Sequence, residues 1–201
     1  MPKLKETLLF PRFAFYKRVG IFFVIFLVCL LGGGSVAQTS PMPDDATLKA
    51  VFIERFTRFV EWPDASLDTV SDSEFFICAL GDDNFSRTVA KVYVNKKILD
   101  RRVVVKTVRV SQISECHVLY LPTLGQTQLF DVLSRVKTRP VLTISDTQGY
   151  AQRGVQINFF YVNDQLRFEI NEAAMRKANF QVSYKLLSYA VIVEPFEDET
   201  F

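Results

Sequence analysis

Apolar and polar positions alternate most regularly in residues 140–187, and the rest of the chain is interpreted around this stretch. The largely apolar residues 141–144 predict a strand that leads into a polar loop with two glycines. Residues 157–162 are rich in β-branched and aromatic side chains, Asn163-Asp164 is a typical turn pair, and residues 166–170 alternate between apolar and charged. This pattern predicts a β-hairpin with one buried face.

A helix is predicted directly after the hairpin. Asn171 is a favourable N-cap, Glu172 supplies an acid in the first turn, and apolar residues recur at helical spacing as far as Leu187. We expect this helix to lie on the hairpin.

Helices and strands alternate upstream of that unit. The predicted elements are a helix that starts at Asp44 or Asp45 and ends at Trp62-Pro63, a strand at 75–80, a helix near 85–92, strands at 103–110 and 117–121, a helix capped by Thr123 and ending at Val136, and a strand after Pro140. This order predicts a single α/β domain with a mixed, mostly parallel sheet, a C-terminal antiparallel hairpin and helices on both faces.

The first 37 residues have the layout of a secretory signal peptide. A basic segment precedes an apolar run at residues 21–31, and a glycine break leads to Ser35-Val36-Ala37. The run is shorter than the roughly 18–20 residues that span a bilayer, so we expect cleavage after Ala37 and export to the periplasm. Residues 38–45 then form a tether, 46–193 the folded domain and 194–201 an acidic, frayed tail.

Removing the leader changes the charge of the protein. Of the 24 basic and 22 acidic side chains, five and one lie in residues 1–37, so residues 38–201 carry 19 and 21, a net charge of −2. A near-neutral body lacks the clustered basic face that nucleic acid requires, so no nucleic-acid partner is expected.

Two cysteines, Cys78 and Cys116, remain in a compartment that permits disulfides. Both fall on predicted strands, and adjacent strands allow the short Cα separation that a disulfide needs, so pairing is favoured. Two buried free thiols are the alternative.

The sequence lacks the groups that most enzymes use. Its single histidine, His117, follows Cys116 on a predicted strand, where neighbouring side chains point to opposite faces, so a structural role is favoured over a catalytic dyad. No catalytic motif or paired-carboxylate cluster occurs, and two paired cysteines leave nothing for zinc. We therefore expect no enzyme activity, no cofactor and no metal.

A small-ligand sensor is one functional hypothesis. Backbone amides in the turn at 81–84 and the strand end at Asp146 offer a crevice of the kind that binds ligands in α/β sheets. Capping of a helix by Asp82 or Asp83 is the alternative. The candidate ligand-binding residues are Arg55, Arg58 and Trp62 at the end of the first helix, together with Asp82, Asp83 and Asp146.

Five segments carry a family resemblance. In order along the chain they are LKAVFIERFTRFVEWP at 48–63, FICALGDDNF at 76–85, CHVLYL at 116–121, VLTISDTQG at 141–149 and INFFYVNDQLRFEIN at 157–171. Together, after a signal peptide, they resemble the YfiR/HmsC family of periplasmic proteins, and the resemblance covers nearly all of residues 46–193.

The resemblance implies a periplasmic regulator that binds and represses an inner-membrane diguanylate cyclase, lowering cyclic di-GMP and biofilm formation. It also implies an outer-membrane lipoprotein as a second partner, and a homodimer is left open. The family's disulfide falls on Cys78 and Cys116, whereas a second bridge of some members falls in the loop at 145–154, which has no cysteine here. A periplasmic small-ligand sensor without a cyclase partner is the alternative function.

The hairpin and the helix after it are the expected partner-binding region. Phe159 and Phe160 are neighbours on a strand, so one ring points outward if the other points inward. The candidate partner-binding residues are Phe159, Phe160, Glu169 and Asn171. Burial of both rings under helices on the two faces of the sheet is the alternative.

Overall fold

The computed structural model describes residues 44–63 and 73–196. All of them belong to the second of the two units into which the chain divides, Met1–Met42 and Pro43–Phe201. The expected signal peptide at 1–37 and most of the tether at 38–45 lie outside the described residues. Within these described ranges, no helix has the length and apolar character required to cross a membrane.

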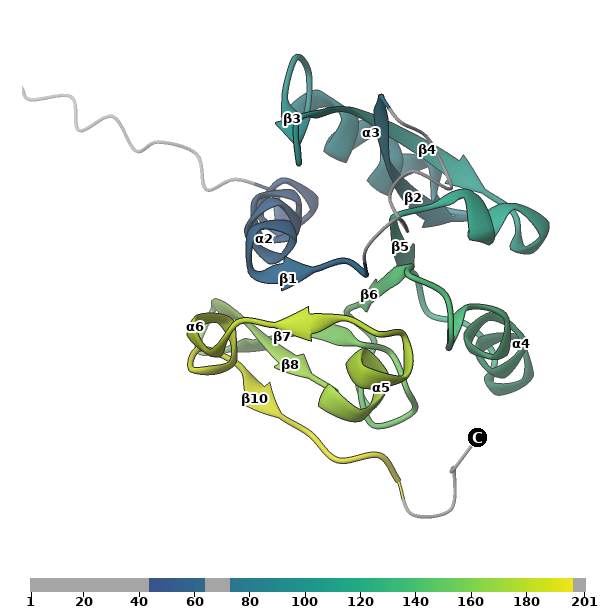
Figure 1. Ribbon diagram of the computed structural model, residues 1–201, viewed down its shortest axis with the longest axis vertical. Coiled ribbons are helices and arrows are strands. Elements are labelled where there is room, and N and C mark those ends of the chain that lie inside the picture. The colour runs from purple at the N-terminus through teal and green to yellow at the C-terminus, as the bar shows by residue number, and fades with distance from the viewer. Residues whose placement is uncertain (1–43, 64–72, 197–201) are drawn as a thin grey trace, which may run out of the picture. The chain divides into compact units, whose positions relative to one another are not determined.

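Helices and strands alternate along most of the chain (Figure 1). The helices are α2 Asp45–Phe59, α3 Asp83–Val92, the 3-10 helix η1 Val110–Glu115, α4 Gln126–Val136, α5 Glu172–Lys177 and α6 Tyr184–Leu187. The strands are β1 Val60–Glu61, β2 Glu74–Leu80, β3 Lys97–Ile98, β4 Arg101–Val108, β5 Val118–Leu121, β6 Leu142–Ser145, β7 Ile157–Val162, β8 Gln165–Ile170, β9 Gln181–Val182 and β10 Val191–Ile192.

The main sheet of the described residues has the strand order β10-β8-β7-β6-β5-β2-β4-β3. The central strands β4, β2, β5, β6 and β7 run parallel to their neighbours in that order. Strands β7 and β8 form the antiparallel hairpin, and β3 pairs antiparallel with β4 at the other edge. The predicted mixed, mostly parallel α/β sheet with a C-terminal hairpin is therefore confirmed.

Alternating side chains of the central strands divide the core into two clusters. Phe75, Ile77 and Ala79 of β2 pack on one face with residues of α2 and α3. Cys78 and Leu80 point to the other face and pack with residues of α4. Helices on both faces, as expected from the sequence, explain why β2 and β5 read as nearly continuous apolar runs.

Local signals placed the hairpin and the first helices correctly. The Asp44 carboxylate accepts a hydrogen bond from Thr47 N at 2.8 Å and caps α2. The turn residues Asn163 and Asp164 have φ of 49° and 60°, a left-handed conformation that Asn and Asp tolerate better than most residues. These positions confirm the predicted start of α2 and the predicted hairpin turn.

The single helix predicted from Asn171 to Leu187 is wrong. Helix α5 ends at Lys177, Asn179 adopts a φ of 59°, and β9 then pairs antiparallel with β1 before α6 begins. Main-chain pairing of Val182 with Val60 holds this segment extended, even though its apolar spacing suits a helix. A pairing between residues so distant in the sequence overrides the local pattern.

Two smaller expectations also fail. Helix α4 begins after Gly125, and the hydroxyl of Thr123 shares a hydrogen bond of 2.9 Å with the hydroxyl of Thr147 instead of capping the helix. The tail is not frayed at its start, because Val193 N donates to Ile170 O and Phe196 N donates to Gln152 O. Residues 197–201 lie outside the described residues.

A disulfide joins the central strand to its neighbour. Cys78 lies on β2 and Cys116 lies two residues before the start of β5, their Cα atoms are 5.9 Å apart, and both side chains are buried. The bond lies in the α4 side of the core and holds together two parallel strands that are 38 residues apart in the sequence.

Replacing both cysteines, as C78A/C116A, should lower the free energy of unfolding by about 3–4 kcal/mol. The reason is that the disulfide closes a loop and so lowers the conformational entropy of the unfolded chain, whereas the unfolded variant has no such restriction. Urea titration followed by the fluorescence of Trp62, the single tryptophan, measures this change. Reduced wild type should unfold at the same midpoint as the variant, and reductant should leave the variant unchanged. Equal midpoints for oxidised wild type and the variant would show that the bond does not stabilise the fold.

Candidate functional site

The carboxyl ends of β2, β5 and β6 meet at one edge of the sheet, where α/β proteins commonly bind ligands. Asp82 follows β2, and its carboxylate accepts a hydrogen bond of 2.9 Å from Phe85 N, which caps α3. Asp83 is exposed in the first turn of the same helix. Of the predicted ligand-binding residues, these two therefore serve the start of α3.

Asp146, after β6, belongs to a cluster that we call the Lys49 cluster: Asp45, Lys49, Tyr120, Asp146 and Tyr161. Lys49 is only 3% exposed, and its ammonium donates hydrogen bonds to the carboxylates of Asp45 and Asp146. The Tyr161 hydroxyl donates to Asp45, and Tyr120 is hydrogen-bonded to Asp146. The cluster ties the start of α2 to the ends of β5, β6 and β7.

Three groups of the Lys49 cluster have pKa values that differ from their ordinary values. Burial raises the pKa of Asp45, but the hydrogen bonds from Lys49 and Tyr161 outweigh burial and hold this pKa below its ordinary value. The hydrogen bond to Asp45 raises the pKa of Tyr161 to about 12. Burial, with the charge of Asp146, raises the pKa of Tyr120. These shifts keep Asp45 ionised and the two tyrosines neutral near pH 7.

Lys49 does not share the exposed face of α2 on which Arg55 and Arg58 lie. Lys49 lies four residues before Ile53 and seven before Phe56, both fully buried, so it occupies the apolar stripe of the helix. An Asp four residues earlier was the available signal, because Asp45 and Lys49 form an i,i+4 pair. The second carboxylate, Asp146, is 97 positions away in the sequence and gave no local signal.

The remaining predicted ligand residues lie at the other end of the strands. The Trp62 indole donates a hydrogen bond of 3.2 Å to the carbonyl of Pro140, just before β6, and its ring packs edge-on against Phe75 and Phe180. Arg58 is exposed and pairs with Glu54. Arg55 is exposed and lies over the ring of Phe52. The structure therefore does not bring these three residues together with Asp82, Asp83 and Asp146 in one pocket.

His117 is buried beside the disulfide. Its Nδ1 accepts a hydrogen bond of 2.9 Å from Phe76 N, and its ring stacks on Phe75 with centroids 4.7 Å apart. An accepting Nδ1 places the proton of the neutral ring on Nε2. These contacts support the structural role that the sequence favoured. Among the described residues, no three His, Cys, Asp or Glu side chains come together as metal ligands.

The predicted partner-binding residues separate into two pairs. Phe159 is buried against Phe52 and Phe56 of α2, and Asn171 is buried as the N-cap of α5, where its amide also donates to Ala151 O. Phe160 and Glu169 are partly exposed on the opposite face of the hairpin. The inward and outward alternation of the two phenylalanines is as expected.

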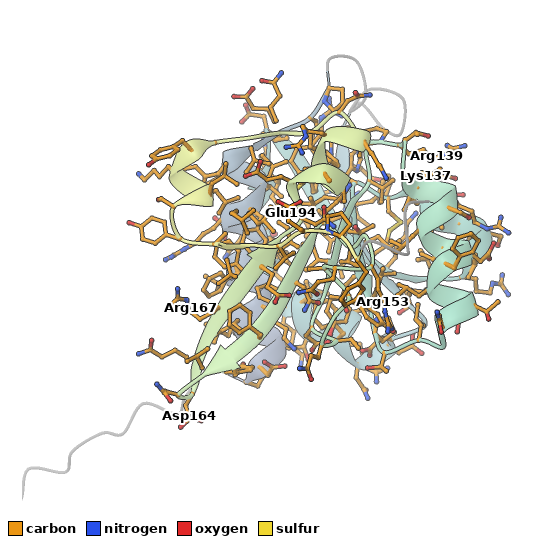
Figure 2. The ribbon with its side chains drawn as sticks, turned by 90° about the horizontal axis from the view of Figure 1, so that it is seen from below. Lys137, Arg139, Arg153, Asp164, Arg167 and Glu194 are labelled. Carbon is orange, nitrogen blue, oxygen red and sulfur yellow. A yellow bond between two sulfur atoms is a disulfide. The ribbon has the colours of Figure 1, made fainter. Side chains whose placement is uncertain are left out.

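The outward face of the hairpin continues onto the edge strand β10. Phe160 pairs with the exposed Arg167, and Glu169 pairs with the exposed Val191 of β10. We call Phe160, Arg167, Glu169 and Val191 the hairpin-edge surface. Figure 2 shows Asp164 at the hairpin turn and Arg167 pointing away from the core.

Exposed aromatic side chains border this surface. Tyr184 is 83% exposed, and Tyr189 follows on the turn between α6 and β10. Sequence analysis missed Tyr184, because it assigned the segment up to Leu187 to one continuous helix packed on the hairpin, and it gave no role to Tyr189, which follows that helix. Mixed apolar, aromatic and charged side chains at a sheet edge are a composition suited to protein–protein contact.

Together, the disulfide, the mixed sheet and the partly exposed hairpin face define a mixed α/β protein. The chain belongs to the YfiR/HmsC-like family, whose model matches residues 46–191. This match confirms the resemblance seen in the sequence. No curated protein matches this chain.

Replacing Lys49, as K49M, should lower the free energy of unfolding at pH 7 by about 1–3 kcal/mol, because two carboxylates are left without their shared cation. The effect stays below that of a fully buried pair, since the Asp45 and Asp146 side chains are 53% and 33% exposed. Urea titration of both proteins measures the difference. The exposed pair Lys96–Glu54 supplies the control, K96M, which should change stability by less than about 1 kcal/mol.

The difference between K49M and wild type should also shrink in acid. The folded-state pKa of Asp45 is depressed, so its contribution is present at neutral pH and is lost as the pH falls through that pKa. Repeating the titrations between pH 7 and about pH 3 tests this sign. A difference that grows in acid would contradict the assignment of the Lys49 cluster as a tie.

Proposed function

We propose that this protein is a periplasmic regulator that binds and represses an inner-membrane diguanylate cyclase, thereby lowering cyclic di-GMP and biofilm formation. The observation that carries the proposal is membership of the YfiR/HmsC-like family over residues 46–191. The exposed hairpin face, and a polar cluster that is committed to holding the fold, are compatible with action by contact rather than by turnover. An outer-membrane lipoprotein is proposed as a second partner that relieves the repression.

The hairpin-edge surface is the proposed contact site for the cyclase. Phe160 supplies an apolar anchor, and Arg167 and Glu169 on the neighbouring strand supply charges of both signs beside it. An aromatic group next to charged groups is a frequent makeup of interface hot spots. Phe159 and Asn171 are buried and contribute indirectly, because they hold the hairpin against α2 and α5.

The leader belongs to the same proposal, because a periplasmic regulator must be exported. We expect the mature chain to begin at Gln38, directly after Ala37. N-terminal sequencing of the protein recovered from the periplasmic fraction measures this boundary. Recovery of the uncleaved chain in the cytoplasmic fraction would contradict it.

Deleting the gene should raise cyclic di-GMP and biofilm mass, and the wild-type gene should restore both. Complementation with F160S/R167E should leave cyclic di-GMP high, because the apolar anchor and one charge of the contact surface are lost. The control V94S changes an exposed apolar residue near the opposite edge of the sheet and should complement fully. Cyclic di-GMP measured by mass spectrometry, with equal protein levels, distinguishes the variants.

The two parts of the proposal fail separately. An unchanged cyclic di-GMP level after deletion would overturn the regulatory function. Full complementation by F160S/R167E would overturn only the contact surface. Capture of a membrane cyclase by the immobilised mature protein, and its loss with F160S/R167E, tests the contact directly.

A further inference from the structure

A cavity of about 460 Å³ lies on the α4 side of the sheet, between α4 and α5. Leu129, Leu133 and Val136 of α4 form one apolar wall, and Ala173 and Ala174 of α5 form the opposite wall. We call this cavity the α4–α5 groove. Its volume falls in the range of about 300–1,000 Å³ that is typical of small-molecule sites.

The groove is lined by cations and by no acid. Lys137, Arg153 and Lys177 belong to its lining, and no Asp or Glu among the described residues does. The nearest acids on the two helices are already paired, Asp131 with Arg135 and Glu172 with Arg176. Figure 2 shows Arg153 and Lys137 on the same side of the protein, beside α4. This charge favours an anionic occupant.

Three polar atoms in the groove also lack a hydrogen-bond partner among the described residues. Two of them are buried, the donor Nε of Arg153 and the acceptor Oε1 of Gln152. A carboxylate can accept a hydrogen bond from this Nε but cannot donate one to the Oε1. The guanidinium of Arg153 likewise forms none of the ion pairs found in the described part of the chain. A buried guanidinium Nε without an acceptor is unfavourable, and a carboxylate would accept charge-assisted hydrogen bonds from it.

Gln156 at the floor of the groove supplies the third atom. It is only 3% exposed, and its Oε1 accepts hydrogen bonds from Thr143 N at 2.6 Å and from Thr143 Oγ1 at 3.1 Å. A backbone N–H can only donate, so this contact fixes which end of the amide is oxygen. The amide nitrogen of Gln156 is left as a second donor and has no hydrogen-bond partner within the described ranges.

We propose that the α4–α5 groove binds a carboxylate carried on an apolar chain, of the kind found in medium-chain fatty acids. The carboxylate lies against the guanidinium of Arg153 and the amide nitrogen of Gln156, and the chain runs along the apolar wall of α4. Residues 129–137 of α4 extend over about 12 Å at the helical rise of 1.5 Å per residue, which suits an elongated chain better than a compact ligand.

The groove adjoins the base of the hairpin that carries the proposed contact surface. Gln156 precedes β7 and Asn171 follows β8, both line the groove, and Asn171 N donates a hydrogen bond of 3.0 Å to Gln156 O. A ligand in the groove therefore touches both ends of the hairpin. The binding site does not depend on the proposed function, because binding is measured on the purified protein alone.

Decanoate, used below its micelle concentration, is the probe. Isothermal titration should show saturable binding of decanoate to the mature protein, with binding at least tenfold weaker for decanol, which lacks the charge, and for acetate, which lacks the chain. R153M should weaken decanoate binding at least tenfold, because the cation is lost while the apolar stem is kept. R87M removes an exposed arginine from α3, on the other face of the sheet, and should bind as wild type does.

A second variant guards against loss of folding. A173F places a ring in the groove from the helix α5 and should abolish decanoate binding while the unliganded melting temperature stays close to that of wild type. Equal binding of decanoate and decanol, wild-type affinity in R153M, or the absence of saturable binding would each overturn the proposal.

A shortened chain that ends at Phe196 tests whether the occupant of the groove is a small molecule or the C-terminal residues of the protein itself. Residues 197–199 are acidic, and Pro195 lines the groove, so these residues match the same site in charge. Decanoate binding by both the full and the shortened chains supports a ligand site. Binding by the shortened chain alone would identify the occupant as this segment and would overturn the proposal.

Discussion

Burial of both faces of the central strand β2 is the constraint on which the structure depends. Parallel strands need long crossover connections, and those connections place helices on the faces of the sheet. Here alternate residues of β2 enter two separate apolar clusters, one under α2 and α3 and the other under α4. The disulfide from Cys78 to Cys116, just ahead of β5, lies in the second cluster and joins the two strands at the centre of the sheet. The strand order of the sheet keeps both apolar clusters away from solvent.

The hairpin is attached to this centre in a less symmetrical way. Its inner face is covered by the aromatic residues of α2, with Phe56 and Phe168 rings 4.9 Å apart, whereas its outer face is partly exposed. The Lys49 cluster fixes the start of α2 at the strand ends, so α2 and the hairpin keep their relative position. An exposed face backed by a rigid, fully packed one is well suited to recognition, because little conformational freedom is lost on binding.

Charge is distributed differently over the two sides of the sheet. On the α2 side the buried cation Lys49 has two carboxylate partners, so its charge is satisfied within the fold. On the α4 side Arg153 lines a groove in which the described lining residues include no acid. The first arrangement stabilises the fold, and the second leaves a charge available to something outside it. This contrast explains why the edge of the sheet expected to bind a ligand became a structural tie while the groove did not.

The sequence by itself determined the features that depend on neighbouring residues: the hairpin and its Asn163-Asp164 turn, the capping of α2 and α3 by aspartates, the succession of helices and strands before the hairpin, and the family. Each of these is encoded by a spacing of two to four residues or by a short motif, so no knowledge of distant contacts is needed. Only the tertiary structure decided that Lys49 is buried between two acids, that the stretch from Asn171 to Leu187 breaks to let β9 pair with β1, and that Gln152, Arg153 and Gln156 line a groove with α4 and α5. These features join residues that are far apart in the sequence, and their energies depend on which groups meet in the folded protein.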